Sequence, residues 1–110
     1  MKNLYVTGYK PQELNIFNSK DKRIPFIKEA LKRRIIQLVE EEGIEWIIVS
    51  GQQGVELWAA EVTLELKEDY MLKLAVVPPF LHQEKKWKEE SQEYYYFIAE
   101  QADFYKPLTN

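Results

Sequence analysis

A strand, a glycine-bearing turn and a helix follow one another in Trp46-Ile47-Ile48-Val49-Ser50-Gly51-Gln52-Gln53-Gly54-Val55-Glu56-Leu57-Trp58. The run Trp46–Val49 is apolar throughout and β-branched after its first residue, which is typical of a strand buried on both faces of a parallel sheet. Trp46 is therefore interpreted as a core residue. From Val55 the apolar positions repeat at helical spacing, which predicts a helix from Val55 to about Glu68.

The same two kinds of element recur on either side of this stretch. Apolar runs predict further strands at Leu4–Thr7 and Leu74–Val77, and helical spacing predicts helices over about Lys22–Glu42 and Gln83–Ala102. Gly43 is a typical helix stop. The resulting order β-α-β-α-β-α predicts a three-layer α/β/α fold with a parallel sheet and right-handed crossovers. No element is predicted after the last helix.

Length and charge limit the class of protein. A chain of 110 residues corresponds to a single domain, expected here over residues 1–110. The net charge of −3 argues against a nucleic-acid partner, because such proteins usually carry a basic face. The basic cluster of Lys32, Arg33 and Arg34 is interpreted as a solvated helix face.

Residue usage also limits the chemistry. The chain has no cysteine, which excludes a disulfide scaffold, thiolate catalysis and cysteine-ligated metals. Its single histidine, His82, is interpreted as a surface or capping residue, and no metal site is expected. The N-terminus lacks the apolar core of a signal peptide, and no apolar run approaches the ~20 residues that span a bilayer. We therefore expect a soluble cytoplasmic protein with no membrane partner.

Ligands of open parallel sheets bind at the carboxyl ends of the strands, and three segments follow the predicted strands. Glycines there let the backbone turn tightly and approach a ligand, and a helix N-terminus attracts phosphate. Glu56 in the first helical turn has the simpler role of complementing the helix dipole, and Lys10 that of an exposed loop lysine. The candidate ligand-binding residues are Thr7, Gly8, Tyr9, Lys10, Ser50, Gly51, Gln52, Gln53, Gly54, Glu56, Pro79, Phe80 and Trp87.

Aromatic residues lie close to these segments, but no catalytic residue can be assigned. Trp58 and Trp87 either pack in the core or stack on a base or ribose. The run of tyrosines at 94–96 covers all faces of a helix, so at least one of them is exposed. Ser50 does not lie in a Gly-x-Ser-x-Gly elbow, and no Gly-Lys-Ser/Thr sequence follows the glycines.

The chain resembles the YpsA family of the SLOG superfamily of Rossmann-like domains over essentially its whole length. The resemblance rests on Thr7-Gly8-Tyr9-Lys10-Pro11, Glu13–Phe17, Trp46–Glu61, Pro79-Phe80, Gln83-Glu84-Lys85 and Trp87-Lys88. It implies a Rossmann-like fold and the binding of a nucleotide or nucleotide derivative, such as NAD or ADP-ribose, at the strand ends. For YpsA-like proteins it also implies a link to cell division or stress in Gram-positive bacteria, with cell-division proteins as partners.

The same superfamily includes phosphoribohydrolases, which use a Pro-Gly-Gly-x-Gly-Thr-x-x-Glu motif. Aligned from Ser50, this motif keeps glycines at Gly51 and Gly54 but has Trp58 at the position of the catalytic glutamate. An indole cannot act as a general acid. Hydrolysis of a nucleotide glycosidic bond, the alternative function, would therefore need Glu56 as its acid.

YpsA-like proteins are longer than this chain. The resemblance therefore implies that the chain corresponds to the N-terminal part of the family's domain and is incomplete relative to it. The additional strands would pair beside Leu4–Thr7. Without them, this strand would have an exposed apolar edge. We therefore expect either a truncated chain or a homo-oligomer that covers this edge. A protein-interaction module with a vestigial pocket is a further alternative.

Overall fold

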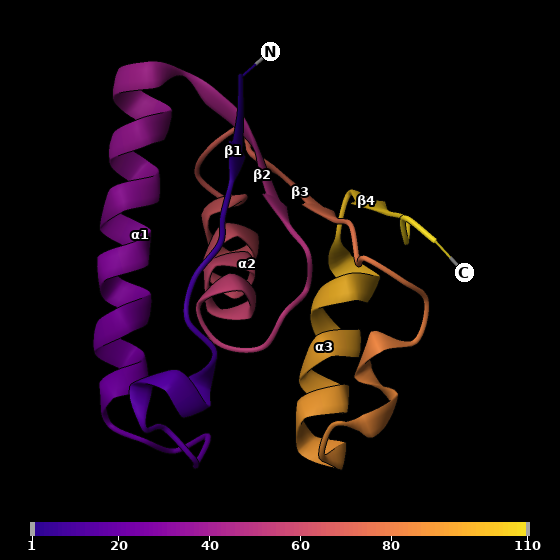
Figure 1. Ribbon diagram of the computed structural model, residues 1–110. Helices are drawn as coiled ribbons and strands as arrows, with labels where there is room; N and C mark the ends of the chain where they lie inside the picture. The colour runs from indigo at the N-terminus through magenta and orange to yellow at the C-terminus, as the bar shows by residue number, and fades with distance from the viewer. Residues whose placement is uncertain (1, 110) are drawn as a thin grey trace.

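The computed structural model describes residues 2–109 and contains a parallel four-stranded sheet in this part of the chain. The strands lie in sequence order across the sheet and alternate with helices, as Figure 1 shows. This confirms the α/β class and the Rossmann-like arrangement. The elements are β1 (Lys2–Tyr5), η1 (Pro11–Leu14), α1 (Arg23–Glu42), β2 (Ile44–Val49), α2 (Val55–Leu66), β3 (Lys73–Val76), η2 (Gln83–Lys86), α3 (Glu89–Gln101) and β4 (Phe104–Tyr105).

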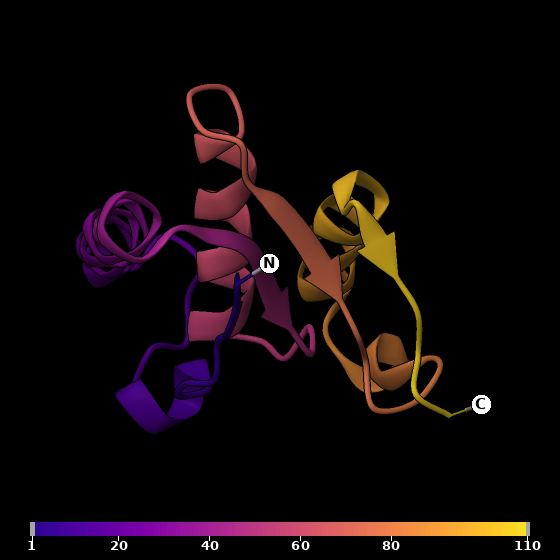
Figure 2. The same cartoon turned by 90° about the horizontal axis from the view of Figure 1, so that it is seen from above.

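All three α-helices cover the same face of the sheet. From left to right in the view from above, α2 lies between α1 and α3 (Figure 2), and buried residues of all three helices share one core with the sheet. The Tyr94 hydroxyl of α3 donates a hydrogen bond to the Leu57 carbonyl of α2, at 3.3 Å. Three successive right-handed crossovers that each step to the next strand in the same direction place every helix on one face. Residues 2–109 thus form two layers, and the expected third layer is not found among them.

The core lies between the sheet and the helices. Alternate strand residues point into it, because successive side chains of a strand face opposite sides of the sheet. Burial of one such aliphatic side chain contributes about 1.5–3 kcal/mol to folding. The side chains of this core that are at most 2% exposed are Ile35, Ile47, Val49, Leu57, Ala60, Val62, Leu74, Val76, Tyr95 and Ile98.

The opposite face of the sheet is open in the described part of the chain. Tyr5 is 72% exposed and Phe104 is 46% exposed, while Trp46 and Ile48 are partly exposed. The interpretation of Trp46 as a core residue is therefore wrong, because helices cover only one face of β2. Lys73 lies beside Trp46 on β3, with its Nζ 5.5 Å from the centroid of the indole ring.

The helix boundaries follow local signals. α1 begins at Arg23, one residue later than predicted, and ends before Gly43, which has a φ of +69° and donates its N–H to the Val39 carbonyl. α2 begins at Val55 as predicted and ends at Leu66 rather than Glu68. Eight of its twelve residues are buried, because it is the middle helix of the row. No helix within residues 2–109 is long and apolar enough to cross a membrane.

The third predicted helix is divided in two. Gln83–Lys86 form the short helix η2, and α3 starts only at Glu89, because Trp87 and Lys88 have extended backbone. The predicted strands also shift: β1 covers Lys2–Tyr5 instead of Leu4–Thr7, β2 starts two residues early at Ile44, and β3 covers Lys73–Val76. The two-residue strand β4 was not predicted, and it pairs with β3.

Candidate functional site

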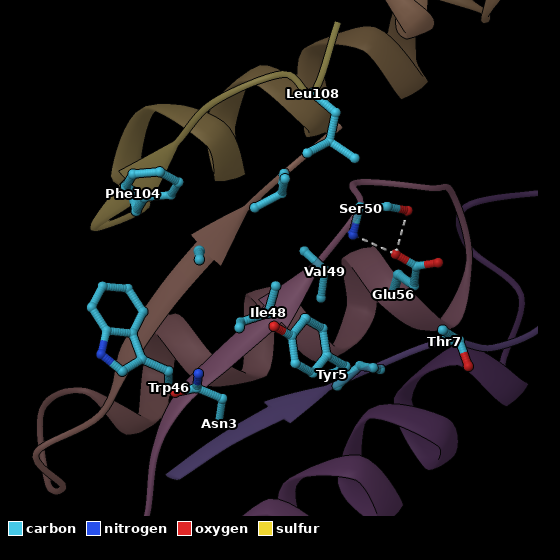
Figure 3. Close-up of a pocket in the computed structure, with 13 residues that line it drawn as sticks. Asn3, Tyr5, Thr7, Trp46, Ile48, Val49, Ser50, Glu56, Phe104 and Leu108 are labelled. Carbon is cyan, nitrogen blue, oxygen red and sulfur yellow. Dashed lines mark hydrogen bonds between the residues drawn. The ribbon is translucent and has the colours of Figure 1, made fainter. Parts of the chain in front are cut away.

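The turn between β2 and α2 is closed by a contact between Ser50 and Glu56. Oε1 of Glu56 accepts hydrogen bonds from the backbone N–H and from the hydroxyl of Ser50, each at 2.7 Å (Figure 3). Glu56 is only 7% exposed, and a buried carboxylate requires such donors. The carboxylate thus binds back to the end of β2, a more specific role than the dipole complementation suggested by its position.

Each of the three glycines at the strand ends contacts another part of the protein. A Cβ on Gly8 would lie 2.6 Å from the Cβ of Val55, and one on Gly51 would lie 2.7 Å from Cε1 of Tyr95. A Cβ on Gly54, whose φ is +94°, would overlap the Tyr9 carbonyl oxygen. Close packing within the protein therefore accounts for these glycines, so that they do not by themselves indicate a ligand.

The segment after β1 lies against the start of α2. The N–H of Val55 donates to the Tyr9 carbonyl at 3.1 Å, so part of the predicted phosphate site is occupied by the chain itself. The neighbouring N–H of Gln53 donates to Oε1 of Gln52 at 3.1 Å. Lys10 is exposed, and its own N–H donates to Oε1 of Glu13 in η1 at 2.8 Å.

Partly buried polar contacts support the Ser50–Gly54 turn from the side of η2 and α3. Nε2 of Gln83 donates to the Ser50 carbonyl at 2.8 Å, and the hydroxyls of Tyr95 and Tyr105 are 3.3 Å apart. Burial, together with the contact to Tyr105, raises the pKa of Tyr95 above its ordinary value, so its hydroxyl stays protonated. Sequence reasoning did not assign Gln83 or Tyr95 to the site. Gln83 belonged to the stretch that carries the family resemblance, which was the available signal.

A second buried carboxylate holds η2 against α3. Glu84 is 3% exposed, and its Oε2 accepts a hydrogen bond from the Tyr96 hydroxyl at 2.7 Å. This hydrogen bond raises the pKa of Tyr96. Trp87 packs edge-on against Tyr95, with ring centroids 5.5 Å apart. The segment that carries Trp87 is thus fixed on both sides.

Two hollows adjoin these elements. One is a depression of about 660 Å³ over the open face of the sheet, with the Ser50–Glu56 pair at the carboxyl end (Figure 3). The other is a groove of about 920 Å³ between the segment before α1, the start of α2 and the start of α3. We call it the helix-side groove, and its lining includes Phe17, Lys28, Gln53, Gly54, Trp58, Lys86, Trp87, Lys88, Tyr94 and Phe97.

Six of the thirteen predicted site residues line one or the other of these two hollows. Thr7, Ser50 and Glu56 line the depression, whereas Gln53, Gly54 and Trp87 line the helix-side groove. Trp58 is 6% exposed and packs with Ile16 and Ile24, so it is mainly a core residue at the groove's floor. The candidates that line neither hollow are Gly8, Tyr9, Lys10, Gly51, Gln52, Pro79 and Phe80.

The turn after β3 contacts the C-terminal stretch. The Thr109 hydroxyl donates to the Pro79 carbonyl at 3.0 Å, and the Leu81 N–H donates to the Thr109 carbonyl at 3.0 Å. Phe80 is 49% exposed beside them. Within residues 2–109, no group of three or more histidine, cysteine, aspartate or glutamate residues could hold a metal ion.

Comparison with known proteins identifies close relatives. A family model described as the YspA SLOG family matches residues 4–110. A UPF0398 protein from Brevibacillus brevis is 58% identical over 94% of this chain and 55% of its own length. A UPF0398 protein from Oceanobacillus iheyensis is 53% identical over 98% of this chain and 58% of its own length. The UPF0398 protein YpsA from Bacillus subtilis is 52% identical over the whole chain and 61% of its own length. The chain therefore spans about three-fifths of the length of these relatives.

Proposed function

Because the chain belongs to the YspA SLOG family, we propose that it binds a nucleotide or nucleotide derivative, of the NAD or ADP-ribose type, in the helix-side groove. The observation that carries this proposal is the composition of the groove. Gln53 and Gly54 at the start of α2 lie in one hollow with the indole of Trp87 and with Lys86 and Lys88. Helix N-termini and lysines suit phosphate, and aromatic faces suit a base or ribose.

The position of the groove also supports the proposal. Its lining includes Gln53 and Gly54 of the turn that follows β2, and α/β sheets bind ligands at the carboxyl ends of their strands. The Ser50–Glu56 contact and the Gln83 hydrogen bond fix the turn that precedes α2. A fixed turn holds the N–H groups at the start of α2, other than that of Val55, in one direction, which lowers the entropy lost when a ligand is bound.

A matched pair of tryptophan variants tests the proposal. We would titrate NAD, ADP-ribose, AMP, ATP and sugar phosphates into the chain and measure heat and thermal stability. A ligand at about 100 times its dissociation constant adds about 2.7 kcal/mol to stability. Trp87→Leu should weaken binding at least about tenfold, a loss of about 1.4 kcal/mol, while Trp46→Leu on the open face should leave it unchanged.

Either of two outcomes would contradict this function. One is that none of the five ligand types binds to the folded chain. The other is that a ligand binds but the Trp46→Leu variant loses it and the Trp87→Leu variant does not. Circular dichroism of both variants shows whether each is folded before its titration is interpreted.

Glycosidic-bond hydrolysis is a second candidate function, favoured by the position of Glu56. Its carboxylate lines the open-face depression although the residue is only 7% exposed. A general acid must reach the leaving oxygen directly or through one water. Glu56→Gln should then abolish release of the base while leaving the affinity for the nucleotide unchanged. Equal turnover by the variant and the original chain would reject Glu56 as the acid.

A further inference from the structure

Glu84 in η2 is a buried carboxylate that no cation accompanies. It is 3% exposed, and no lysine or arginine within residues 2–109 forms an ion pair with it. Its Oε2 accepts a hydrogen bond from the Tyr96 hydroxyl of α3 at 2.7 Å. Burial of a carboxylate without a cation lowers stability, but a hydrogen bond to a charged oxygen is strong and directional. Such a contact is better suited to fixing a geometry than to stabilising a fold.

The neighbours of Glu84 in the chain reach the proposed binding site from two sides. Gln83 donates to the Ser50 carbonyl at 2.8 Å and so supports the turn before α2. Trp87 directly follows η2 and lines the helix-side groove. Its N–H donates to the Glu84 carbonyl at 3.0 Å. A movement of η2 would therefore displace both the support of the turn and the indole in the groove.

Contacts with α3 complete the support of Trp87. Nε2 of Gln92 donates to the Trp87 carbonyl at 2.9 Å. The indole packs edge-on against Tyr95, which packs in the same way against Tyr96 with ring centroids 5.8 Å apart. Glu84 and Tyr96 line neither of the two hollows. Their contact can therefore act on a bound ligand only through the residues that it holds in place.

We propose that Glu84 is a positioning residue, whose hydrogen bond with Tyr96 sets the orientation of the Trp87 indole in the helix-side groove before a ligand binds. Its effect on ligands rests on the proposed function, which places a base or ribose on that indole. An indole that is already held in place loses less freedom on binding, and this raises affinity. Loss of the Tyr96 hydroxyl should therefore weaken nucleotide binding from outside the groove.

A matched pair of tyrosine variants tests the proposal without a ligand. Tyr96→Phe removes the hydroxyl that binds Glu84, and Tyr70→Phe removes one that donates to Glu40 at 3.2 Å, a pair that lines neither hollow. Both variants keep the aromatic ring. The 110-residue chain is labelled with fluorinated tryptophan, and Trp87→Phe identifies the fluorine NMR signal of Trp87 by its loss. This signal should shift or broaden in Tyr96→Phe and stay unchanged in Tyr70→Phe.

Affinity and rescue by a conservative variant provide the second measurement. Calorimetric titration of NAD and ADP-ribose should show binding to Tyr96→Phe that is at least about fivefold weaker than to Tyr70→Phe or to the original chain. Glu84→Gln keeps an acceptor oxygen for the Tyr96 hydroxyl and should leave the Trp87 signal close to its original position. Glu84→Ala should shift that signal as Tyr96→Phe does.

Three results would overturn the proposal. The first is an unchanged Trp87 signal in Tyr96→Phe, and the second is an equal shift in Tyr70→Phe. The third is a shifted signal in Tyr96→Phe with unchanged affinity for the bound nucleotide. If neither nucleotide binds the original chain, the proposed function fails, and the signals without ligand still decide whether Glu84 positions Trp87. If Glu84→Ala does not fold, the comparison of the two tyrosine variants decides alone.

Discussion

One carboxylate oxygen of Glu56 accepts both hydrogen bonds that Ser50 can donate, each at 2.7 Å. Ser50 directly precedes the turn 51–54, and Glu56 is the second residue after it. Their contact therefore joins the two ends of the turn. The Ser50 carbonyl is bound in turn by Gln83. The start of α2 and the end of β2 are therefore fixed relative to η2, whether or not a ligand is present.

Loss of the Glu56 carboxylate should destabilise the protein. Glu56→Ala leaves the partly buried N–H and hydroxyl of Ser50 without their acceptor, which should lower the free energy of unfolding by about 2–3 kcal/mol. Glu56→Gln keeps an acceptor oxygen and should cost about half as much. Urea denaturation measures both values. Glu65→Ala, at an exposed position of the same helix, is the control, and an equally large loss in that variant would contradict the role of the contact.

A methyl group at Gly54 should be far more costly than one at Gly43. Both glycines have positive φ, which costs an ordinary residue about 1–2 kcal/mol. A Cβ on Gly43 would meet nothing within 4 Å, whereas one on Gly54 would overlap the Tyr9 carbonyl oxygen. Gly54→Ala should therefore lower the free energy of unfolding by at least about 2 kcal/mol more than Gly43→Ala does. Denaturant unfolding of both variants measures this difference. Similar losses in both variants would mean that the segment after β1 moves away easily.

Acid should remove a contribution of Asp103, which joins the end of α2 to β3. Burial disfavours its ionisation, but hydrogen bonds from Nζ of Lys67 and from the Leu74 N–H, at 2.7 and 2.8 Å, outweigh this effect and lower its pKa. A carboxyl whose pKa is lower in the folded state stabilises the fold above its unfolded pKa and loses that effect as pH falls. The stability gap between the original chain and Asp103→Asn should be constant near neutral pH and shrink below about pH 4. A gap that does not change between neutral and acidic pH would contradict this assignment.

The sequence predicted the elements better than their arrangement. The strand–turn–helix at 46–58 was predictable because apolar runs and glycines are local signals. The side of the sheet on which each helix lies was not, because it depends on strand order, and this is why Trp46 was wrongly assigned to the core. The break between η2 and α3 at Trp87 could not be predicted, because Trp87 lies at helical spacing from Tyr94. In the structure, Trp87 has extended backbone and packs edge-on against Tyr95.

The candidate site residues were predicted at the strand ends, and the structure places three of them in each of two hollows and seven in neither. The rule of strand ends selects segments of the chain, but tertiary contacts decide what each residue of a segment faces. Gly51 lies against Tyr95, which is distant in sequence, and no local pattern contains that information. β4 was missed for a related reason, since two residues are too few to show a period.

Two neighbouring isoleucines on β2 provide the sharpest test of the two-layer arrangement. Ile47 is fully buried under the helices, whereas Ile48 points to the open face and is partly exposed. Truncating a buried isoleucine costs about 2–5 kcal/mol, because apolar contacts are lost and a cavity remains. Ile47→Ala should therefore lower the free energy of unfolding by an amount in that range, and Ile48→Ala should lower it by about 1 kcal/mol. Urea denaturation at several protein concentrations measures both losses. A large cost for Ile48→Ala that grows with concentration would contradict this expectation and would show that a second copy covers the open face.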